Sequence, residues 1–396
     1  MKSLFFILTF TVFLQASSIS LNNILQKLRY EHPMAKSIQE YQDAYNAENN
    51  ANSSRKALQI SAEEAYTSPD FAESGYEYKV GIQQSFMHPS VKKSLLKSAR
   101  YESDAKILNL KHSFLLLKNN VRLLYHISCL DQKAIKQYKT SYEAFKTLYL
   151  KKEKAYRYGE ISKKELLQLQ IELDRLKNEY KHYRSEEKIS RNNLQSTILL
   201  PIFQNKPLSC QDTYKVIERL TLNNTQDSLQ VQSLNKKIQS VESDFNRFNT
   251  MFDSFTLSAS YQEELNTNRF ILGLSIPLSF TSSINKENRA AALYKKSAFT
   301  YEREGIQLQK SSKIALLKKR LQQEFQDIEA LNSMLERYEG ELMPLVERGY
   351  QLGEDSAIEY LLSKREIWKF KAQLIKHYKN YYQTLFRLYS VLEIKD

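Results

Sequence analysis

The residues of this sequence that could do chemistry are six histidines, two cysteines and the carboxylates that follow a repeated turn. The histidines are scattered, and neither they nor the six methionines show the spacing of a metal site. No glycine-rich phosphate loop appears, and the chain has only eight glycines in 396 residues. We therefore expect no enzyme, no cofactor and no metal ion bound by the protein itself.

One turn occurs twice, 194 residues apart (350 − 156). The shared residues are Tyr156, Gly159, Glu160 and Ser162 in the first copy and Tyr350, Gly353, Glu354 and Ser356 in the second. The glycine suits the left-handed residue that ends a helix. The serine, with Glu165 or Glu359 three residues later, is typical of a capping box that starts the next helix. The chain is therefore predicted to contain two helical hairpins joined by similar tips, as a duplicated fold would.

Long helices on both sides of each tip are the main predicted elements. No Gly or Pro interrupts residues 90–157, which would form about 100 Å of helix at ~1.5 Å per residue. Apolar residues recur every three to four positions, a spacing that favours coiled-coil packing. The hairpins are predicted at 90–200 and 284–394, with a second long helix at about 284–352. Shorter helices are predicted at about 34–58 and 220–249.

Between these helices the pattern changes to a period of two, which predicts strands at about 57–67, 76–87, 253–263 and 269–280. About ten residues suffice for a tilted strand to cross a bilayer. The residues predicted to face lipid are Tyr78, Val80, Ile82, Leu257, Leu272, Leu274 and Ile276. The residues predicted to form aromatic girdles at the strand ends are Tyr66, Phe71, Tyr76, Phe255, Tyr261 and Phe280. Four strands cannot close a barrel, so several copies of the chain would be needed.

The N-terminus predicts export. Residues 1–16 have the Lys2 charge, the short apolar run and the cleavage context of a signal peptide. The net charge of +13 is then interpreted as lysine-rich solvated helix faces and contact with anionic lipid head groups, with no nucleic-acid partner. In an oxidising compartment Cys129 and Cys210 could pair. Cys129 lies about 42 Å up the first hairpin and the returning helix rises about 57 Å before the linker that holds Cys210. A disulfide and two free thiols remain the alternatives.

Over nearly its whole mature length, the chain resembles the TolC-type outer membrane efflux proteins. The resemblance rests on the two strand hairpins, on the two tips and on the leucine-rich start of each returning helix. Gly81, Gly273 and Pro277 also stand where that family's strands lead into its long helices. The implied division is a first TolC-like repeat at 17–200, a linker or equatorial segment at 201–219 and a second repeat at 220–396.

The resemblance implies a mainly α fold with a β-barrel part. Three chains would supply four strands each to a twelve-stranded outer membrane barrel, which continues into a long periplasmic α-helical barrel. The implied function is an exit duct in the outer membrane of a Gram-negative bacterium. The tips would dock onto a periplasmic adaptor that connects to an inner membrane pump, with an RND-type pump favoured.

Two finer inferences follow from the resemblance. Leu342-Met343-Pro344 is similar to the heavy-metal cation branch, which makes metal cations candidate substrates. Glu359 stands where some members place the first of two acids that line a periplasmic gate, but Leu362 occupies the second position. We favour the capping box as the role of Glu359, and we interpret Glu165 in the same way.

Three alternatives remain. The chain could be the exit duct of a type I secretion system, or an exported structural coiled-coil protein without a pore. A periplasmic adaptor is disfavoured, because adaptors have one helical hairpin and glycine-rich β-domains.

Overall fold

The computed structural model describes residues 18–68, 74–201, 206–218, 227–264, 267–278 and 283–394. The predicted signal peptide and the girdle residues Phe71 and Phe280 lie outside these residues. The chain forms two compact units. The sheet unit comprises Ser37–Ser113 and Thr225–Ser312, and the hairpin unit comprises Met1–Lys36, Phe114–Asn224 and Lys313–Asp396. Three helices contribute residues to both units: α2 (Pro33–Ser53), α3 (Pro89–Arg157) and α6 (Ile284–Arg337).

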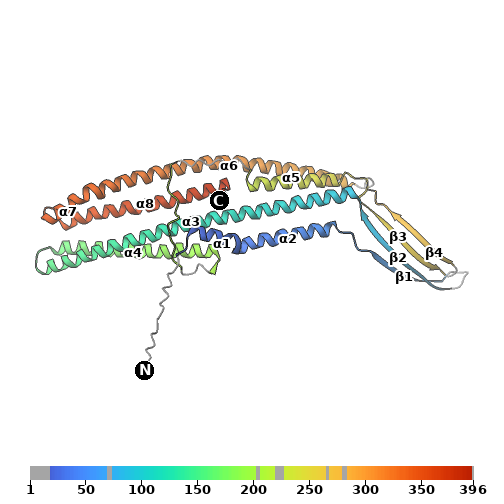
Figure 1. The fold of residues 1–396 in the computed structure, drawn as a ribbon, viewed down its shortest axis with the longest axis horizontal. Coiled ribbons are helices and arrows are strands. Elements are labelled where there is room, and N and C mark those ends of the chain that lie inside the picture. The colour runs from blue at the N-terminus through green and yellow to red at the C-terminus, as the bar shows by residue number, and fades with distance from the viewer. Residues whose placement is uncertain are drawn as a thin grey trace, which may run out of the picture. The chain divides into compact units, whose positions relative to one another are not determined.

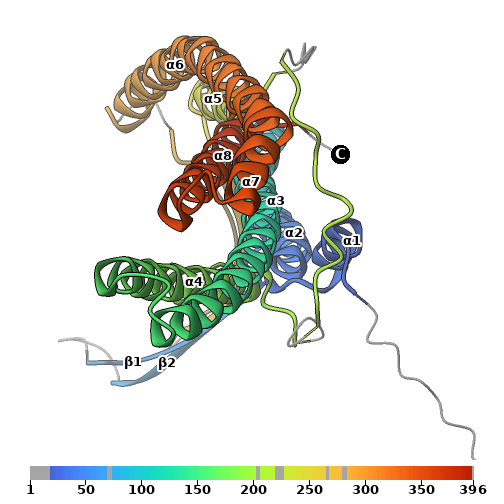
Figure 2. The same cartoon turned by 90° about the vertical axis from the view of Figure 1, so that its left-hand side faces the viewer.

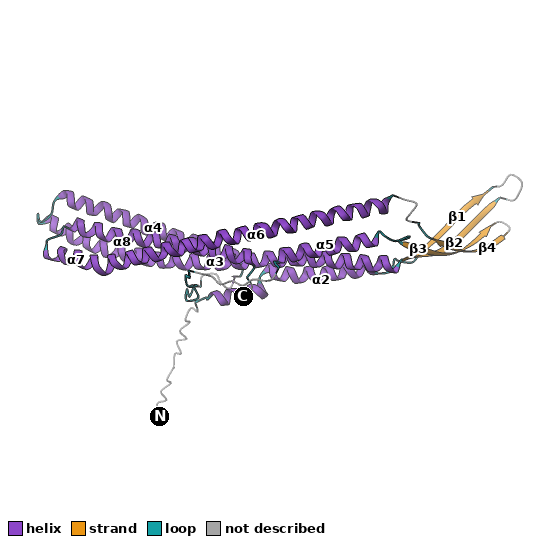
Figure 3. Cartoon of the chain, turned by 90° about the horizontal axis from the view of Figure 1, so that it is seen from above, coloured by secondary structure: helices purple, strands orange, loops and turns teal. Residues whose placement is uncertain are grey.

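The sheet unit contains one antiparallel sheet with the strand order β1-β2-β3-β4 (Figures 1 and 3). The strands are β1 (Gln59–Thr67), β2 (Gly75–Met87), β3 (Ser254–Glu264) and β4 (Thr267–Ser275). The central β2–β3 pair joins the hairpin of the first repeat to that of the second, with Met87 opposite Ser254. The two sequence repeats therefore form a single sheet.

Small polar side chains bring the helices of the sheet unit close together. The Ser240 hydroxyl on α5 (Leu229–Arg247) donates to the Ser98 carbonyl on α3 at 3.0 Å. Seven residues away on each helix, the Ser233 hydroxyl of α5 donates to the Ala105 carbonyl of α3 at 2.9 Å. Both serine side chains are buried, and each hydroxyl has a partner, as a buried polar group requires.

Two helices of the sheet unit differ from the prediction. α2 ends at Ser53 instead of near residue 58, because the Ser53 and Ser54 hydroxyls both donate to the Asn50 carbonyl and compete with the helical hydrogen bonds there. α5 begins at Leu229, where the Ser228 hydroxyl caps it by accepting from the Val231 N–H; residues 220–226 of the predicted helix lie outside the described residues.

The hairpin unit contains α1 (Leu21–Glu31), α4 (Lys163–Ile198), α7 (Met343–Leu352) and α8 (Ala357–Leu392) with the remaining parts of α3 and α6. Figure 2 shows α4 beside the end of α3, and α8 beside α7, as two helical hairpins. Among the described residues, no helix is both long enough and apolar enough to cross a membrane.

Three apolar clusters hold the hairpin unit together. One joins α1, α3 and α4 around the fully buried Tyr125. A second joins α6 to α8 around Ile328 and Phe386. The third joins the two hairpins, with Phe145 and Leu169 packed against Leu361 and Trp368. Trp368, the lone tryptophan, contacts the edge of Phe145 with a 6.5 Å centroid distance and is a packing residue.

Helical structure covers the predicted range 284–352, but one turn of this second long helix is not α-helical. A π-helical turn, η3 (Tyr338–Leu342), separates α6 from α7, and the Met343 N–H donates to the Tyr338 carbonyl five residues back. The cause is Pro344, which lacks an N–H and would clash with the carbonyl four residues earlier in a regular helix. The extra residue in the turn accommodates it.

Candidate functional site

The strand register places the predicted lipid-facing residues on one face of the sheet. Residues directly opposite each other in an antiparallel pair point to the same side. Val80 lies opposite Tyr261, and Ile82 lies opposite Ala259. Leu257 lies opposite Leu274, and Ala259 opposite Leu272, in the next pair. We call this side the apolar face; its strand residues among those predicted are Tyr78, Val80, Ile82, Leu257, Leu272 and Leu274.

Ile276 is an exception. β4 ends at Ser275, so the prediction that the strand continues to residue 280 is wrong, and Ile276 lies just beyond it. The reason is Pro277, which has no N–H to donate to a neighbouring strand. Residues 279 and 280 of the predicted strand lie outside the described residues.

The apolar face is open to its surroundings. Leu272 is 87% exposed, Leu274 is 62% exposed and Phe270 is 85% exposed. Burying a leucine side chain contributes about 1.5–3 kcal/mol, so a row of such residues left in water is unfavourable. Contiguous exposed apolar surface of this kind indicates contact with another protein or with a membrane.

The opposite face of the same sheet is polar. Its residues include Ser61, Glu63, Lys79, Gly81, Gln83, Ser258, Ser260, Gln262, Arg269, Gly273 and Ser275. A β-carbon at Gly81 would lie 3.1 Å from both Ser61 Oγ and Ser260 Cβ, so the absence of a side chain at Gly81 allows these two serines to pack closely against it. Ile271 is the large apolar residue of this face on β4. One side of the sheet is therefore mainly apolar, with Glu64, Glu263 and Gln84 as polar exceptions, and the other is mainly hydrophilic.

Aromatic pairs lie near the ends of the strands on the apolar face. Tyr66 and Tyr76 pair beside the β1–β2 turn, with ring centroids 5.2 Å apart. Tyr261 and Phe270 pair near the β3–β4 turn at 5.0 Å. At the other end of the strands, Phe86 stacks on Phe255 at 5.3 Å. Four of these residues, Tyr66, Tyr76, Phe255 and Tyr261, are among those that the sequence predicts to form aromatic girdles.

The two tips have the same backbone structure. In each, the glycine has a positive φ, +76° at Gly159 and +79° at Gly353. The Gly159 N–H donates to the Tyr156 carbonyl, and the Gly353 N–H donates to the Tyr350 carbonyl. The following N–H, of Glu160 or Glu354, donates to the carbonyl five residues back at 2.9 Å in both copies. This pair of bonds is a Schellman motif, which requires a left-handed residue where the glycine stands.

The two tips differ at the start of the returning helix. Ser356 and Glu359 form a complete capping box, in which each residue's side chain accepts from the other's backbone N–H. Two hydrogen bonds donated to the Glu359 carboxylate, first from the Ser356 N–H and then from the Ser356 hydroxyl, lower the pKa of Glu359. In the first tip the Ser162 hydroxyl accepts from the Glu165 N–H at 3.1 Å, which is the serine half of the box. The second tip is therefore the more firmly capped.

Asp355 also distinguishes the second tip. A β-carbon at Gly349 would clash with Asp355 Oδ2, because the aspartate side chain lies against the glycine. At the equivalent positions the first tip has Ala155 and Ile161. Tyr350 is stacked on Tyr360 with ring centroids 5.0 Å apart, whereas Tyr156 is exposed.

One apolar position that the sequence analysis did not single out is exposed in both tips. Tyr158 is 81% exposed, and Leu352, 194 residues later, is 64% exposed. Each immediately precedes the left-handed glycine. Comparing the two copies position by position would have identified this pair, although the residue types differ.

Cys129 and Cys210 are joined by a disulfide, with Cα atoms 5.5 Å apart. The disulfide holds residues 206–218, the described part of the linker that follows residue 205, against α3. The Tyr125 hydroxyl accepts from the Cys210 N–H at 3.2 Å, and the Tyr382 hydroxyl of α8 donates to the Tyr214 carbonyl at 2.6 Å. Tyr381 bonds both backbone groups of Ile217. The segment is thus fixed to two helices of the hairpin unit.

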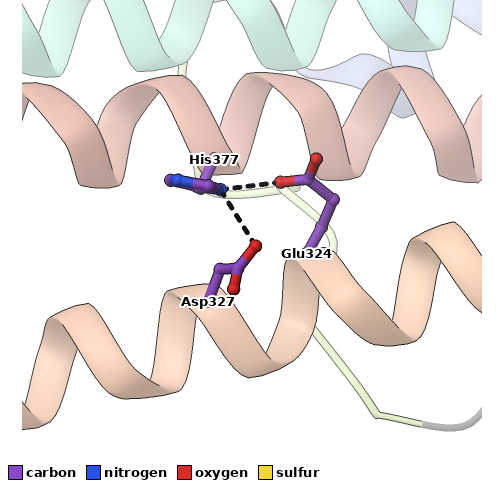
Figure 4. Close-up of side chains that lie close together, drawn as sticks. All are labelled: Glu324, Asp327 and His377. Carbon is purple, nitrogen blue, oxygen red and sulfur yellow. Dashed lines mark hydrogen bonds and ion pairs between the residues drawn. The ribbon is translucent and has the colours of Figure 1, made fainter.

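The sequence alone also did not predict one cluster of potential metal ligands. Glu324 and Asp327 on α6 face His377 on α8 (Figure 4). The three residues are spread over 53 positions, so no local spacing marks them. The absence of a metal-ligand spacing in the sequence still holds, because only the packing of α6 on α8 brings the three residues together.

The comparisons with known proteins identify the fold. No protein-family model matches the sequence, and no curated protein matches it. Solved structures do match. The outer membrane channel CmeC of Campylobacter jejuni is 14% identical with a TM-score of 0.76, covering 94% of this chain and 85% of that one. The outer-membrane channel OprN is 14% identical with a TM-score of 0.78, covering 94% and 89%.

The MtrE outer membrane channel of Neisseria gonorrhoeae, solved in its open state, is 16% identical with a TM-score of 0.75 and covers 94% and 88% of the two chains. Likeness at this level of identity establishes the fold alone. The fold that the sequence resemblance predicts for one chain is confirmed: this chain has the fold of the TolC-type outer membrane channels.

Proposed function

We propose that this protein is an outer membrane exit duct, through which solutes delivered by an inner membrane pump and a periplasmic adaptor leave a Gram-negative cell. The observation that carries the proposal is the register of the sheet. It gathers the exposed apolar residues of four strands on one face and polar residues on the other. A strand that faces lipid on one side and water on the other has this alternation.

The sheet edges support assembly from several chains. Within the described strands, β1 pairs with β2 and β4 pairs with β3, which leaves β1 and β4 as edges. An open edge in the hydrocarbon region leaves N–H and C=O groups without partners, at a cost of several kcal/mol each. Pairing β4 of one chain with β1 of the next removes all edges. Three copies would supply the twelve strands of the barrel, and the helices would form the periplasmic α-barrel.

The tips supply the docking surface in this proposal. Gly159, Glu160 and Ser162 are exposed, as are Gly353, Glu354 and Ser356. Tyr158 and Leu352 add an apolar side chain beside each glycine. Three chains would present six such tips to the periplasmic adaptor, whose partner pump is proposed to be of the RND type.

The direct test places charges on the apolar face. Replacing Leu272 and Leu274 with lysine should abolish membrane assembly, because a lysine facing lipid near the bilayer centre costs about 2–4 kcal/mol. The matched control is Ile271→Lys, on the same strand but on the polar face. The measurement is the amount of trimer in purified outer membranes, together with the amount of soluble chain.

Wild-type levels of membrane trimer with both lysines in place would contradict the duct and favour a structural coiled-coil protein without a pore. Loss of assembly in the Ile271→Lys control as well would show that the sheet tolerates no charge on either face. That result would remove the support that the two-faced sheet gives to the proposal.

For the substrate we propose metal cations, supported by Leu342-Met343-Pro344 and its resemblance to the heavy-metal cation branch. The test compares the growth of a strain lacking this gene with that of its parent in metal salts and in organic antibiotics. Sensitivity to metal salts alone is expected. Sensitivity restricted to antibiotics would reject metal cations, and loss of a secreted protein would favour a type I secretion duct.

A further inference from the structure

Three side chains from two helices converge on one point within the hairpin unit. Nδ1 of His377 on α8 lies 2.8 Å from Oε2 of Glu324 and 3.7 Å from Oδ2 of Asp327, both on α6 (Figure 4). Glu324 and Asp327 are three positions apart, so both carboxylates project from the same side of α6. The three donor atoms all lie within 4.8 Å of one another.

These separations suit a shared metal ion. Two donors of a tetrahedral zinc site with ~2.1 Å bonds are roughly 3.4 Å apart. The two distances from His377 Nδ1, 2.8 and 3.7 Å, lie on either side of that value. Small rotations of the side chains would therefore bring all three donors into coordination distance without moving a helix.

The charge balance at this point also favours a cation. Among the described residues, neither Glu324 nor Asp327 forms an ion pair with a lysine or an arginine; the basic group that both face is His377. This is unusual in a chain with 58 lysines and arginines. Lys379, two residues after His377 on α8, pairs with Asp131 of α3 instead. Two adjacent carboxylates thus share a single imidazole.

The surroundings hold the three side chains in place. The Gln323 amide donates to Oδ1 of Asp327 at 3.0 Å, which leaves Oδ2 directed at His377. Leu321 and Ile328 flank the carboxylates on α6, and Tyr381 lies one turn from His377; all three are buried in the α6–α8 core. Outer hydrogen bonds and a rigid base of this kind orient metal ligands in proteins. The site itself is half-buried, so ions can reach it.

We propose that Glu324, Asp327 and His377 bind a divalent transition-metal cation of the Zn²⁺ type, which ties α6 to α8. One imidazole nitrogen and two carboxylates form an N/O donor set that suits such ions, whereas Mg²⁺ and Ca²⁺ prefer all-oxygen sites. The site is independent of the proposed transport role. If no metal binds here, the duct proposal still stands. If lysines at Leu272 and Leu274 leave membrane assembly intact, the metal-site proposal is unaffected.

The test uses the full-length mature protein purified in detergent and Zn²⁺ alone as the probe. Calorimetric titration of wild type should give one bound Zn²⁺ per chain, and His377→Gln and Glu324→Gln should each weaken its affinity at least about tenfold. The controls are Glu329→Gln, which removes an exposed carboxylate from α6, and His182→Gln, which removes an exposed histidine from α4. Both controls should bind as wild type does. Circular dichroism without metal checks that every variant is folded.

A second measurement needs no variant. Zn²⁺ should protect His377, but not His182, from modification by diethyl pyrocarbonate, as mapped by mass spectrometry. It should also raise the melting temperature of wild type, since it binds the folded state preferentially. Equal Zn²⁺ binding by wild type and His377→Gln, or no protection of His377, would overturn the proposal.

Discussion

Nε2 of His126 on α3 accepts a hydrogen bond from the backbone N–H of Tyr214 at 2.9 Å. Its other ring nitrogen, Nδ1, lies 2.7 Å from the Arg122 carbonyl, which can only accept, so Nδ1 carries the proton. The ring is fully buried. His126 is therefore held as the neutral tautomer, and it fixes the linker segment to α3 from inside the core.

Acid should weaken this attachment. Burial, followed by the nearby charge of Arg122, lowers the pKa of His126 from 6.5 to about 4, although the bond to the Arg122 carbonyl opposes the shift. Because the folded-state pKa is the lower one, the stabilisation is complete above pH 6.5 and is lost as the pH falls towards 4. Over that window the loss is on the order of 3 kcal/mol.

The measurement is the melting temperature of the purified protein at pH 7.5 and pH 4.5. His126→Gln keeps an acceptor for the Tyr214 N–H but does not titrate, so its melting temperature should fall less than that of wild type. The acid sensitivity due to His32, whose pKa burial also lowers, is common to both proteins. Equal losses in wild type and variant would contradict the role of His126.

Removing the disulfide should destabilise the hairpin unit. Cys129 and Cys210 are 81 residues apart, and closing a loop of that size is worth about 4 kcal/mol by chain entropy. We expect Cys129→Ser with Cys210→Ser to lower the melting temperature under oxidising conditions and to match reduced wild type. Peptide mapping without reductant should find the two cysteines joined. Two free thiols in the exported protein would contradict the pairing.

Replacing either tip glycine with a larger residue should cause no steric clash, but it should cost stability because of the left-handed backbone conformation. No atom lies within 4 Å of a β-carbon built at Gly159 or Gly353, so the penalty for alanine is the left-handed φ, about 1 kcal/mol each. Gly305 is the control, since it lies within α6 with equally open space and no positive φ. Gly305→Ala should stabilise the protein by up to about 1 kcal/mol.

Leucine at Gly159 and Gly353 tests docking itself. The new side chains would project from the tips into the surface proposed to meet the adaptor. We expect efflux of metal cations, measured as resistance to metal salts, to be lost in the double variant, while the amount of membrane trimer is unchanged. Normal efflux with both leucines present would rule out the tips as the docking site.

The role of Glu359 can be tested by removing its charge while keeping its shape. Glutamine also completes a capping box, so Glu359→Gln should retain stability and single-channel conductance. Ser356→Ala removes the cap and should cost about 1 kcal/mol. A marked change of cation selectivity in Glu359→Gln would instead support a gate lined by this residue.

Local patterns predicted the elements that depend on neighbouring residues. The positive φ of Gly159 and Gly353 and the serine caps follow from groups within five positions, so the sequence alone identified both tips. The period of two located the strands, because alternate side chains in a strand point to opposite sides. Local patterns did not predict where a single proline changes a regular element: β4 ends before Pro277, and a π-helical turn precedes Pro344.

Contacts between distant residues were decided by the tertiary structure. The sequence predicted two hairpins of strands, but only the β2–β3 pairing shows that their apolar residues share one face. It likewise left the state of Cys129 and Cys210 open, and it gave no sign that His377 meets Glu324 and Asp327. The periodicity of apolar residues indicates which side of a helix or strand is apolar. Which elements then face each other depends on register and packing between segments far apart in the chain, and no local spacing carries that information.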